Sequence, residues 1–263
     1  MYTHRKNFWR THGFTCLTGL LLLFALKLYY SRTDCDGLLW ILAPTAWWIH
    51  TLSGISFEYL PHAGYVNHSF RFVIAASCSG IQFWIVSTAL LLFSFLPRIR
   101  GQKEGLGWLG ISFTVSYIFT ILVNGFRILL SLYLPLYLSD IHKYHHLSRW
   151  ITPERLHTMI GIAVYFGSLL VLFFVIEALF QGTDHSFSYL LLKQNPLLTT
   201  HMRWLLPAFW YFAVVLGLPL LNRAYQHNRQ SFTEYALTIL SVCLPMSLLF
   251  WLVSKAFIWK KRS

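Results

Sequence analysis

The chain has 263 residues, of which 56% are hydrophobic and only 11% are charged, and its mean hydropathy is +0.53. This composition is typical of a polytopic membrane protein and excludes a water-soluble globular domain. The formal net charge of +12 does not indicate nucleic-acid binding. The basic residues lie in short loops and tails between apolar runs, where they orient helices and meet anionic lipid headgroups.

Apolar runs long enough to cross a hydrocarbon core of ~30 Å occur along the whole chain. The fourth run is longer than one crossing needs. We expect it to cross by about residue 127 and to continue as an interfacial or bent extension through Leu138. The sequence therefore predicts an all-α bundle of about 7–8 spans with short loops, forming a single membrane domain over residues 1–263. The expected spans lie near residues 14–30, 37–55, 78–97, 107–137, 157–180, 204–222 and 235–257.

Basic residues predict the orientation of these spans. The segment 1–13 carries three basic residues before the first run but no small-residue cleavage site follows, so we expect a retained first helix. The basic loop 98–106 and the tail 260–262 predict cytoplasmic positions. Seven simple crossings would then place the N-terminus outside, against its own basic residues. This conflict disappears if 37–55, which contains Pro44 and several tryptophans, lies at the interface instead of crossing.

The motif Cys78-Ser79-Gly80 stands at the expected outer end of the third span. Ser77 or Ser79 could cap the start of that helix, and a thiol near a helix N-terminus is favoured as the nucleophilic thiolate. Gly80 would leave room for a substrate backbone to approach the sulfur. Alternatively, Cys78 is a small packing residue of an apolar span.

A second motif, Asn124-Gly125-Phe126-Arg127, lies at the same expected depth. A helix that enters at Gly107 rises about 30 Å by Arg127, which places this arginine in the outer leaflet. Asn124 and Arg127 share one helix face. The guanidinium could hold an oxyanion or a substrate carboxylate. It could equally be a snorkelling interfacial arginine.

A third motif, His157-Thr158-Met159-Ile160-Gly161, opens the fifth span and returns to the same leaflet. Gly161 lies one turn further along the face of His157 and has no side chain to block it. An imidazole here could take a thiol proton and return it to a leaving amine. Alternatively, His157 is an ordinary interfacial histidine. Together, Cys78, Arg127 and His157 outline a cysteine-nucleophile site.

These motifs, in this order across successive spans, resemble those of the exosortase/archaeosortase family of membrane-embedded sorting enzymes. The resemblance rests on Cys78-Ser79-Gly80-Ile81, Asn124-x-x-Arg127 and His157-x-x-x-Gly161. It covers about residues 50–180, which would form the catalytic core, whereas the C-terminal helices at 204–257 match in hydrophobic character. The segment from Phe57 to Cys78 is further similar to the K type of exosortase, although Gln82 replaces the asparagine frequent in that type.

The resemblance implies a transpeptidase-like cysteine peptidase in the inner, or cytoplasmic, membrane, with its active site facing the periplasm or exterior. Cys78 would be the nucleophile, and Arg127 and His157 would complete the site with Asn124 in support. The substrate would be an exported protein whose C-terminus carries a short motif, a transmembrane helix and a basic tail. The acceptor of the cleaved protein stays open between water, an amine and a polysaccharide or lipid.

No cofactor or metal is expected. The four cysteines form no Cys-x-x-Cys pair, so neither a zinc ribbon nor a disulfide framework is indicated. His142, His145 and His146 could bind zinc, but a polar outer loop is the simpler interpretation. Two other classes remain open: a transporter or channel whose polar residues line a solute or proton path, and a non-catalytic subunit of a secretion or polysaccharide-export complex.

Overall fold

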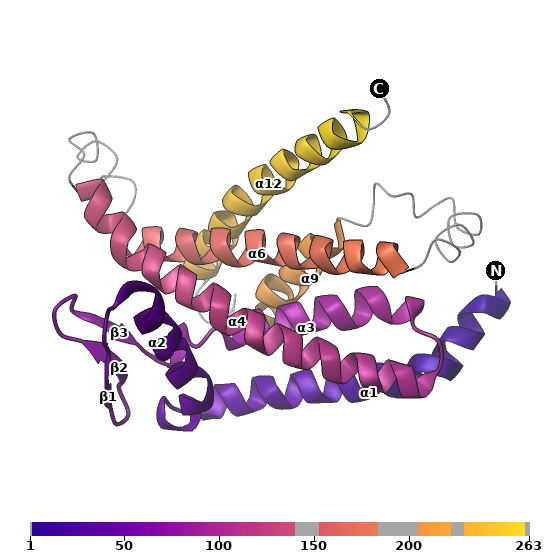
Figure 1. Cartoon of the computed structure of the whole chain (residues 1–263), viewed down its shortest axis with the longest axis horizontal. Helices are drawn as coiled ribbons and strands as arrows, with labels where there is room; N and C mark the ends of the chain where they lie inside the picture. The colour runs from indigo at the N-terminus through magenta and orange to yellow at the C-terminus, as the bar shows by residue number, and fades with distance from the viewer. Residues whose placement is uncertain (1, 140–152, 184–204, 222–228, 261–263) are drawn as a thin grey trace. The chain divides into compact units, whose positions relative to one another are not determined.

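The computed structural model of the chain describes residues 2–139, 153–183, 205–221 and 229–260 (Figure 1). The chain divides into two compact units, Met1–His142 and Lys143–Ser263, and each is described by itself. Almost all described elements are helices, which confirms the expected all-α membrane class.

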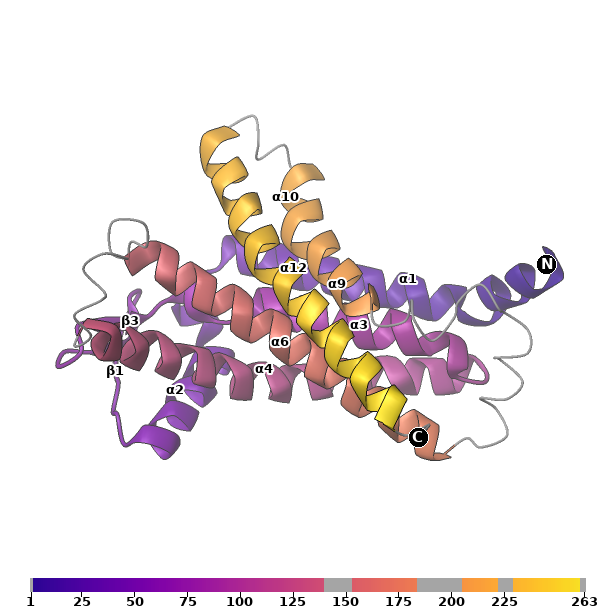
Figure 2. The ribbon, with the colours of Figure 1, turned by 90° about the horizontal axis from the view of Figure 1, so that it is seen from above.

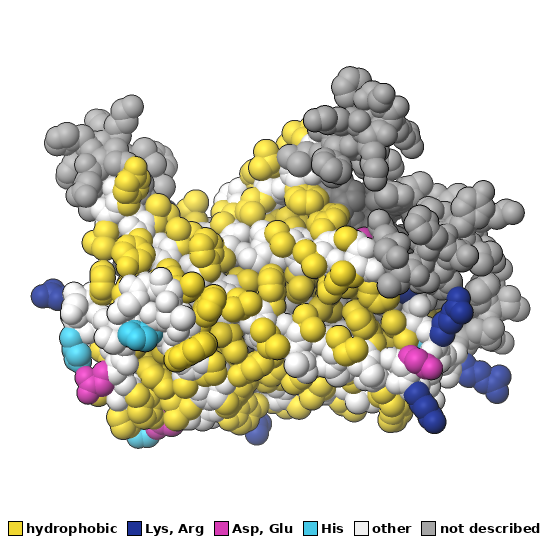
Figure 3. All heavy atoms as spheres, in the orientation of Figure 1, with side chains coloured by type: hydrophobic (Ala, Val, Ile, Leu, Met, Phe, Trp, Pro, Cys, Tyr) yellow, Lys and Arg dark blue, Asp and Glu magenta, His cyan; other side chains and the backbone are white. Residues whose placement is uncertain are grey.

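Five helices are long and apolar enough to cross a membrane, and a sixth apolar helix, Leu205–Leu220, is shorter. Hydrophobic side chains cover most of the visible surface, and the few Lys, Arg, Asp, Glu and His side chains of the first unit gather mainly toward its two ends (Figure 3). A broad apolar surface of this kind is expected of helices that face lipid. The five long spans are Phe8–Arg32, Ala76–Arg98, Gln102–Tyr137, Arg155–Phe180 and Phe232–Leu252.

The first unit is built on α1 (Tyr2–Arg32), α3 (Ile81–Phe95) and α4 (Gln102–Ser139), which lie side by side (Figures 1 and 2). The indole N–H of Trp84 in α3 donates to the carbonyl of Phe113 in α4 at 2.9 Å. The indole N–H of Trp108 donates back to the carbonyl of Leu91 at 3.1 Å. These reciprocal bonds fix two antiparallel helices in register and satisfy indole groups that lipid cannot.

α4 is a single helix of 38 residues, about 57 Å long at 1.5 Å per residue. It passes without interruption through the Asn124–Arg127 motif, so the expected extension beyond residue 127 continues as helix. One of its faces is polar and buried, with residues spaced three or four apart as the helical period requires. This polar face of α4 consists of Ser112, Ser116, Thr120, Asn124, Arg127 and Ser131.

The segment 37–55, expected either to cross or to lie at the interface, contains a short helix, α2 (Leu39–Ser53). Its 15 residues rise about 22 Å, and it ends at Gly54, whose φ is +71°. The chain before α2 meets the chain after it, because the Tyr59 hydroxyl donates to Asp36 at 2.6 Å. The strand after α2 therefore runs back to the connection that precedes the helix.

The connection between α2 and the next span, residues 56–77, contains strands that the predicted all-α class with short loops does not include. It forms a three-stranded antiparallel sheet of β1 (Glu58–Leu60), β2 (Gly64–Asn67) and β3 (Phe72–Ile74), in the order β1-β2-β3. Tyr65 of β2 pairs with Tyr59 on one side and with Ile74 on the other. The sheet and α2 lie at the same end of the first unit (Figure 1), and β3 runs directly toward Cys78.

The second unit contains α6 (Pro153–Thr183), α9 (Leu205–Phe212), the π-helical turn η4 (Ala213–Gly217), α10 (Leu218–Leu221) and α12 (Arg229–Lys260). α6 packs against both α9 and α12 (Figure 2). Aromatic pairs hold these contacts, with ring centroids 5.3 Å apart for Phe166 and Tyr211 and 4.6 Å apart for Phe174 and Phe250.

Candidate active site

Cys78 lies in a 3-10 turn, η2 (Ala76–Cys78), between the end of β3 and the start of α3. Its amide donates to the carbonyl of Ala75 at 2.8 Å, and the amide of Ser79 donates to Ala76 at 3.1 Å. The side chain of Cys78 is 9% exposed. The turn therefore holds the thiol at the end of a helix bundle, just beneath the surface of the described chain.

The expected serine cap of the third span is wrong. α3 begins at Ile81, and its N-cap residue is Gly80, which has no side chain to cap with. Gly80 adopts a left-handed φ of +76°, which glycine tolerates without steric cost. Its carbonyl accepts the amide of Trp84 at 3.0 Å, so the chain turns sharply from η2 into the helix, with Ser79 buried inside the turn.

Gly80 serves close helix packing, whereas the sequence interpretation was that it leaves room for a substrate. A Cβ at this position would lie 3.0 Å from the Cγ2 of Thr120 and 3.2 Å from the Cγ of Asn124. The absence of a side chain lets the turn approach the polar face of α4. The glycine in the motif therefore positions the turn that carries the cysteine.

Asn124 ties α4 to this turn. Its side-chain amide donates to the backbone carbonyl of Cys78 at 2.6 Å, across 46 residues of sequence, and the asparagine is fully buried. A buried hydrogen bond between a side chain and the backbone fixes the turn in one geometry. The structure thus brings together two of the predicted site residues and gives Asn124 a specific role.

Arg127 lies one helical turn beyond Asn124 on the same buried face of α4 and is 8% exposed. A snorkelling arginine would extend its guanidinium to the interface, so the observed burial argues against that alternative. A buried guanidinium in an apolar span is costly and is usually directed at a partner or a functional cavity. Arg127 therefore shares the buried face of α4 with Asn124, the residue that is bonded to the Cys78 turn.

Tyr30, near the end of α1, is a neighbour of Cys78 and Ser79 that sequence reasoning missed. It brings a phenol beside the turn from α1, the predicted first helix. Its approach depends on how α1 packs against α3, which no local motif reveals. The sequence signal was only a tyrosine at the outer end of the first apolar run.

His157 lies in the second unit, near the start of α6, and is half-buried; Gly161, one turn further, is buried. Cys78, Asn124 and Arg127 belong to the first unit. The remaining candidates of the outer loop, His142, His145 and His146, lie outside the described residues. Among the described residues all four cysteines are buried and unpaired in disulfides, including Cys35.

One group of potential metal ligands occurs in the described part of the chain, and it consists of Asp34, Asp36 and His62. It shares no residue with the Cys78 turn.

Comparison of the chain with protein families, with curated proteins and with solved structures gives no match. The fold and the site themselves define an α-helical membrane protein in which a cysteine turn is bonded to a buried polar helix face.

Proposed function

We propose that this protein is an exosortase-like cysteine peptidase or transpeptidase that acts at the extracytoplasmic boundary of the membrane. The observation that carries the proposal is the 2.6 Å hydrogen bond from Asn124 to the carbonyl of Cys78. It links two of the three motifs in space as well as in sequence order. The bond holds the turn that carries the thiol, and a nucleophile must be held within a fraction of an ångström of its productive position.

The proposed orientation places the Cys78 turn outside and the basic loop 98–106 inside. With α2 at the interface, α1, α3, α4, α6, the short helix Leu205–Leu220 and α12 supply six crossings. An even number puts both basic termini on the cytoplasmic side. The conflict found in the sequence therefore disappears under this arrangement.

In the proposed reaction His157 takes the proton of the Cys78 thiol, and the thiolate sulfur attacks a peptide carbonyl of the substrate tail to form a carbon–sulfur bond. Arg127 offsets the negative charge of the tetrahedral oxyanion. The carbon–nitrogen bond then breaks, and His157 gives a proton to the departing amine. The resulting thioester passes its acyl group to water, an amine or a hydroxyl, whose proton His157 accepts as the thiolate is released.

The transporter alternative draws on the same polar face of α4. Ser112, Ser116 and Thr120 are fully buried between packed helices, whereas a solute path would expose its lining residues to water. This burial favours a packed scaffold over a conduit. A non-catalytic subunit, unlike an enzyme, would release no substrate tail in a processing assay.

The test uses exported reporter proteins fused to C-terminal tails that combine a short motif, an apolar helix and a basic cluster, taken from the same genome. We expect the chain to release at least one tail, and Cys78→Ala, Arg127→Ala and His157→Ala to abolish that release. Cys243→Ala, which removes a thiol in the second unit, is the matched control and should retain activity. Continued processing by Cys78→Ala, or no processed tail in the whole set, would contradict the proposal.

A further inference from the structure

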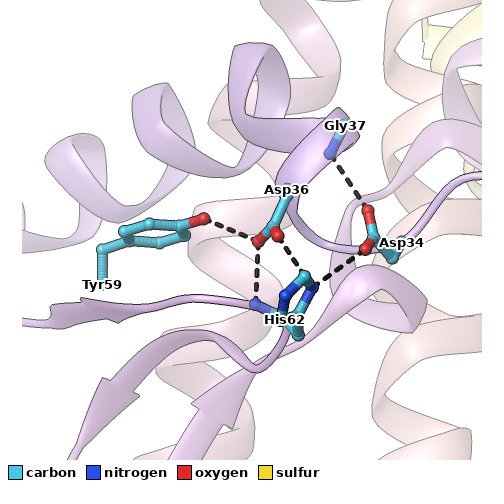
Figure 4. Close-up of polar contacts among 5 residues, drawn as sticks. All are labelled: Asp34, Asp36, Gly37, Tyr59 and His62. Carbon is cyan, nitrogen blue, oxygen red and sulfur yellow. Dashed lines mark hydrogen bonds and ion pairs between the residues drawn. The ribbon is translucent and has the colours of Figure 1, made fainter.

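Asp34, Asp36 and His62 meet at one end of the first unit, just beyond the end of the first span (Figure 4). The aspartates lie in the connection between α1 and α2, and His62 lies in the turn between β1 and β2. The His62 Nδ1 is 2.8 Å from Asp36 Oδ2 and 3.2 Å from Asp34 Oδ2. The imidazole, brought from a separate element, distinguishes this set from the acidic groups that protein surfaces commonly carry.

Each carboxylate has one oxygen already held by donors. Asp36 Oδ1 accepts the Tyr59 hydroxyl at 2.6 Å and the His62 amide at 2.8 Å. Asp34 Oδ1 accepts the Gly37 amide at 3.3 Å. These bonds leave the two Oδ2 atoms facing the imidazole nitrogen, as Figure 4 shows. Hydrogen bonds of this kind orient carboxylate ligands around metal ions.

We propose that Asp34, Asp36 and His62 form a binding site for a divalent first-row transition-metal ion, with Zn²⁺ as the reference probe. Oxygen and imidazole ligands bind such ions at about 2.1 Å, so two ligands lie about 3.0 Å apart at right angles and about 3.4 Å apart in a tetrahedral site. The three ligand atoms of this set lie within 4.8 Å of one another. The two imidazole–carboxylate pairs, at 2.8 and 3.2 Å, lie near the first spacing, and a tetrahedral ion would draw them slightly apart.

Charge also balances at this site. On binding, the ion takes the position of the proton that Nδ1 shares with the carboxylates, and that proton goes to solvent. Two carboxylates and a neutral imidazole then offset the two positive charges of the ion. Water completes the coordination, because all three side chains are at the surface.

The ion would fasten the connection after α1 to the β1–β2 turn. From that turn the chain passes through β2 and β3 into the turn that holds Cys78. A metal link here would therefore stiffen the segment that delivers the cysteine. The proposal does not depend on the enzymatic function, since it concerns ligand atoms in the described chain.

A plain ion pair is the competing explanation. The hydrogen bond to Asp34 and the charge of Asp36 raise the pKa of His62, so a proton alone could bridge the carboxylates. A proton and a metal ion compete for the same nitrogen. The two explanations differ in whether Zn²⁺ binds with a defined stoichiometry and with these ligands.

The experiment is calorimetric titration of the detergent-solubilised full chain with Zn²⁺ after chelator treatment. His142, His145 and His146 are replaced by glutamine to remove the other outer imidazoles. We expect one saturable site, weakened at least tenfold by His62→Gln and by Asp34→Asn. His68→Gln, in the β2–β3 turn of the same sheet and 3.8 Å from Glu58, should leave the affinity within twofold.

Visible absorption with Co²⁺ provides a second measurement that does not depend on the variants. Bands of a cobalt ion with mixed nitrogen and oxygen ligands should appear at one equivalent and disappear on addition of Zn²⁺. Three results would each overturn the proposal and leave the ion pair as the explanation. They are failure of Zn²⁺ to saturate one site, a Zn²⁺ affinity of His62→Gln equal to that of the unmodified site, and a Co²⁺ spectrum of the hydrated ion.

Discussion

Removal of the Asn124 side chain should release the turn that carries Cys78. Asn124→Ala deletes the donor that lies 2.6 Å from the Cys78 carbonyl in a fully buried position. Loss of a buried hydrogen bond that leaves a polar group without that partner costs about 1–3 kcal/mol. If this cost falls on local opening of the turn, exposure of the thiol rises about 5- to 150-fold, since 1.36 kcal/mol is a factor of ten.

The assay is the rate of alkylation of Cys78 in a background in which Cys16, Cys35 and Cys243 are replaced by alanine. Ser116→Ala is the matched control, because it truncates a fully buried polar residue two turns away on the same face of α4. We expect this control to alter the rate by less than twofold. A rate for Asn124→Ala equal to that of the unmodified background would refute the inference that Asn124 holds the turn.

Three further predictions concern packing and charge. Gly80→Ala places a Cβ 3.0 Å from Thr120 at a φ of +76° and should destabilise the protein by about 1–3 kcal/mol. By contrast, the Cβ of Gly110→Ala has no neighbour within 4 Å, so this variant should be neutral or slightly stabilising. Thermal unfolding in detergent measures both variants, and equal melting temperatures would contradict the packing argument. Gly125→Ala puts a Cβ 2.5 Å from the Cδ1 of Trp48, so α2 should shift. Increased quenching of tryptophan fluorescence would report this shift, and unchanged quenching would contradict the prediction. In metal-free protein, the pKa of His62 is raised, so its ion pair stabilises the hairpin below the ordinary pKa of 6.5 and stops doing so as the pH rises through the folded-state pKa. The pKa values of Asp34 and Asp36 are lowered, so this stabilisation persists until the pH falls below 3.8. Proteolysis of the hairpin should be slowest between these two pH limits, and a pH-independent rate would contradict the assignment.

The long spans were predictable because hydropathy alone identifies them. The runs expected at 78–97 and 157–180 fall within the observed spans Ala76–Arg98 and Arg155–Phe180. Lipid exposure requires apolar side chains over about 20 consecutive residues, so the signal is strong and local. Hydropathy alone does not decide the α2 segment, because an apolar run bounded by Asp36 and Gly54 forms a helix of only 15 residues that packs on α4.

The sheet was missed because its strands contain only three or four residues, too few for an alternating pattern to stand out. The motif residues of the site were recognisable, but their roles were not. Gly80 permits contact with Thr120 and Asn124, and Tyr30 lies beside Cys78. Both relations depend on helix packing between distant segments of the chain. The Asp34–Asp36–His62 group likewise joins residues 26 and 28 positions apart.

The central claim is that Cys78 and His157 act on one substrate bond, which requires their side chains to meet. A short bis-alkylating thiol reagent applied to His157→Cys, in the background that retains only Cys78, measures this directly. The account predicts rapid intramolecular crosslinking to Cys78 and little crosslinking with Met159→Cys, which lies at similar depth on the opposite face of α6. Equal yields from the two variants, or no crosslink from His157→Cys, would contradict it.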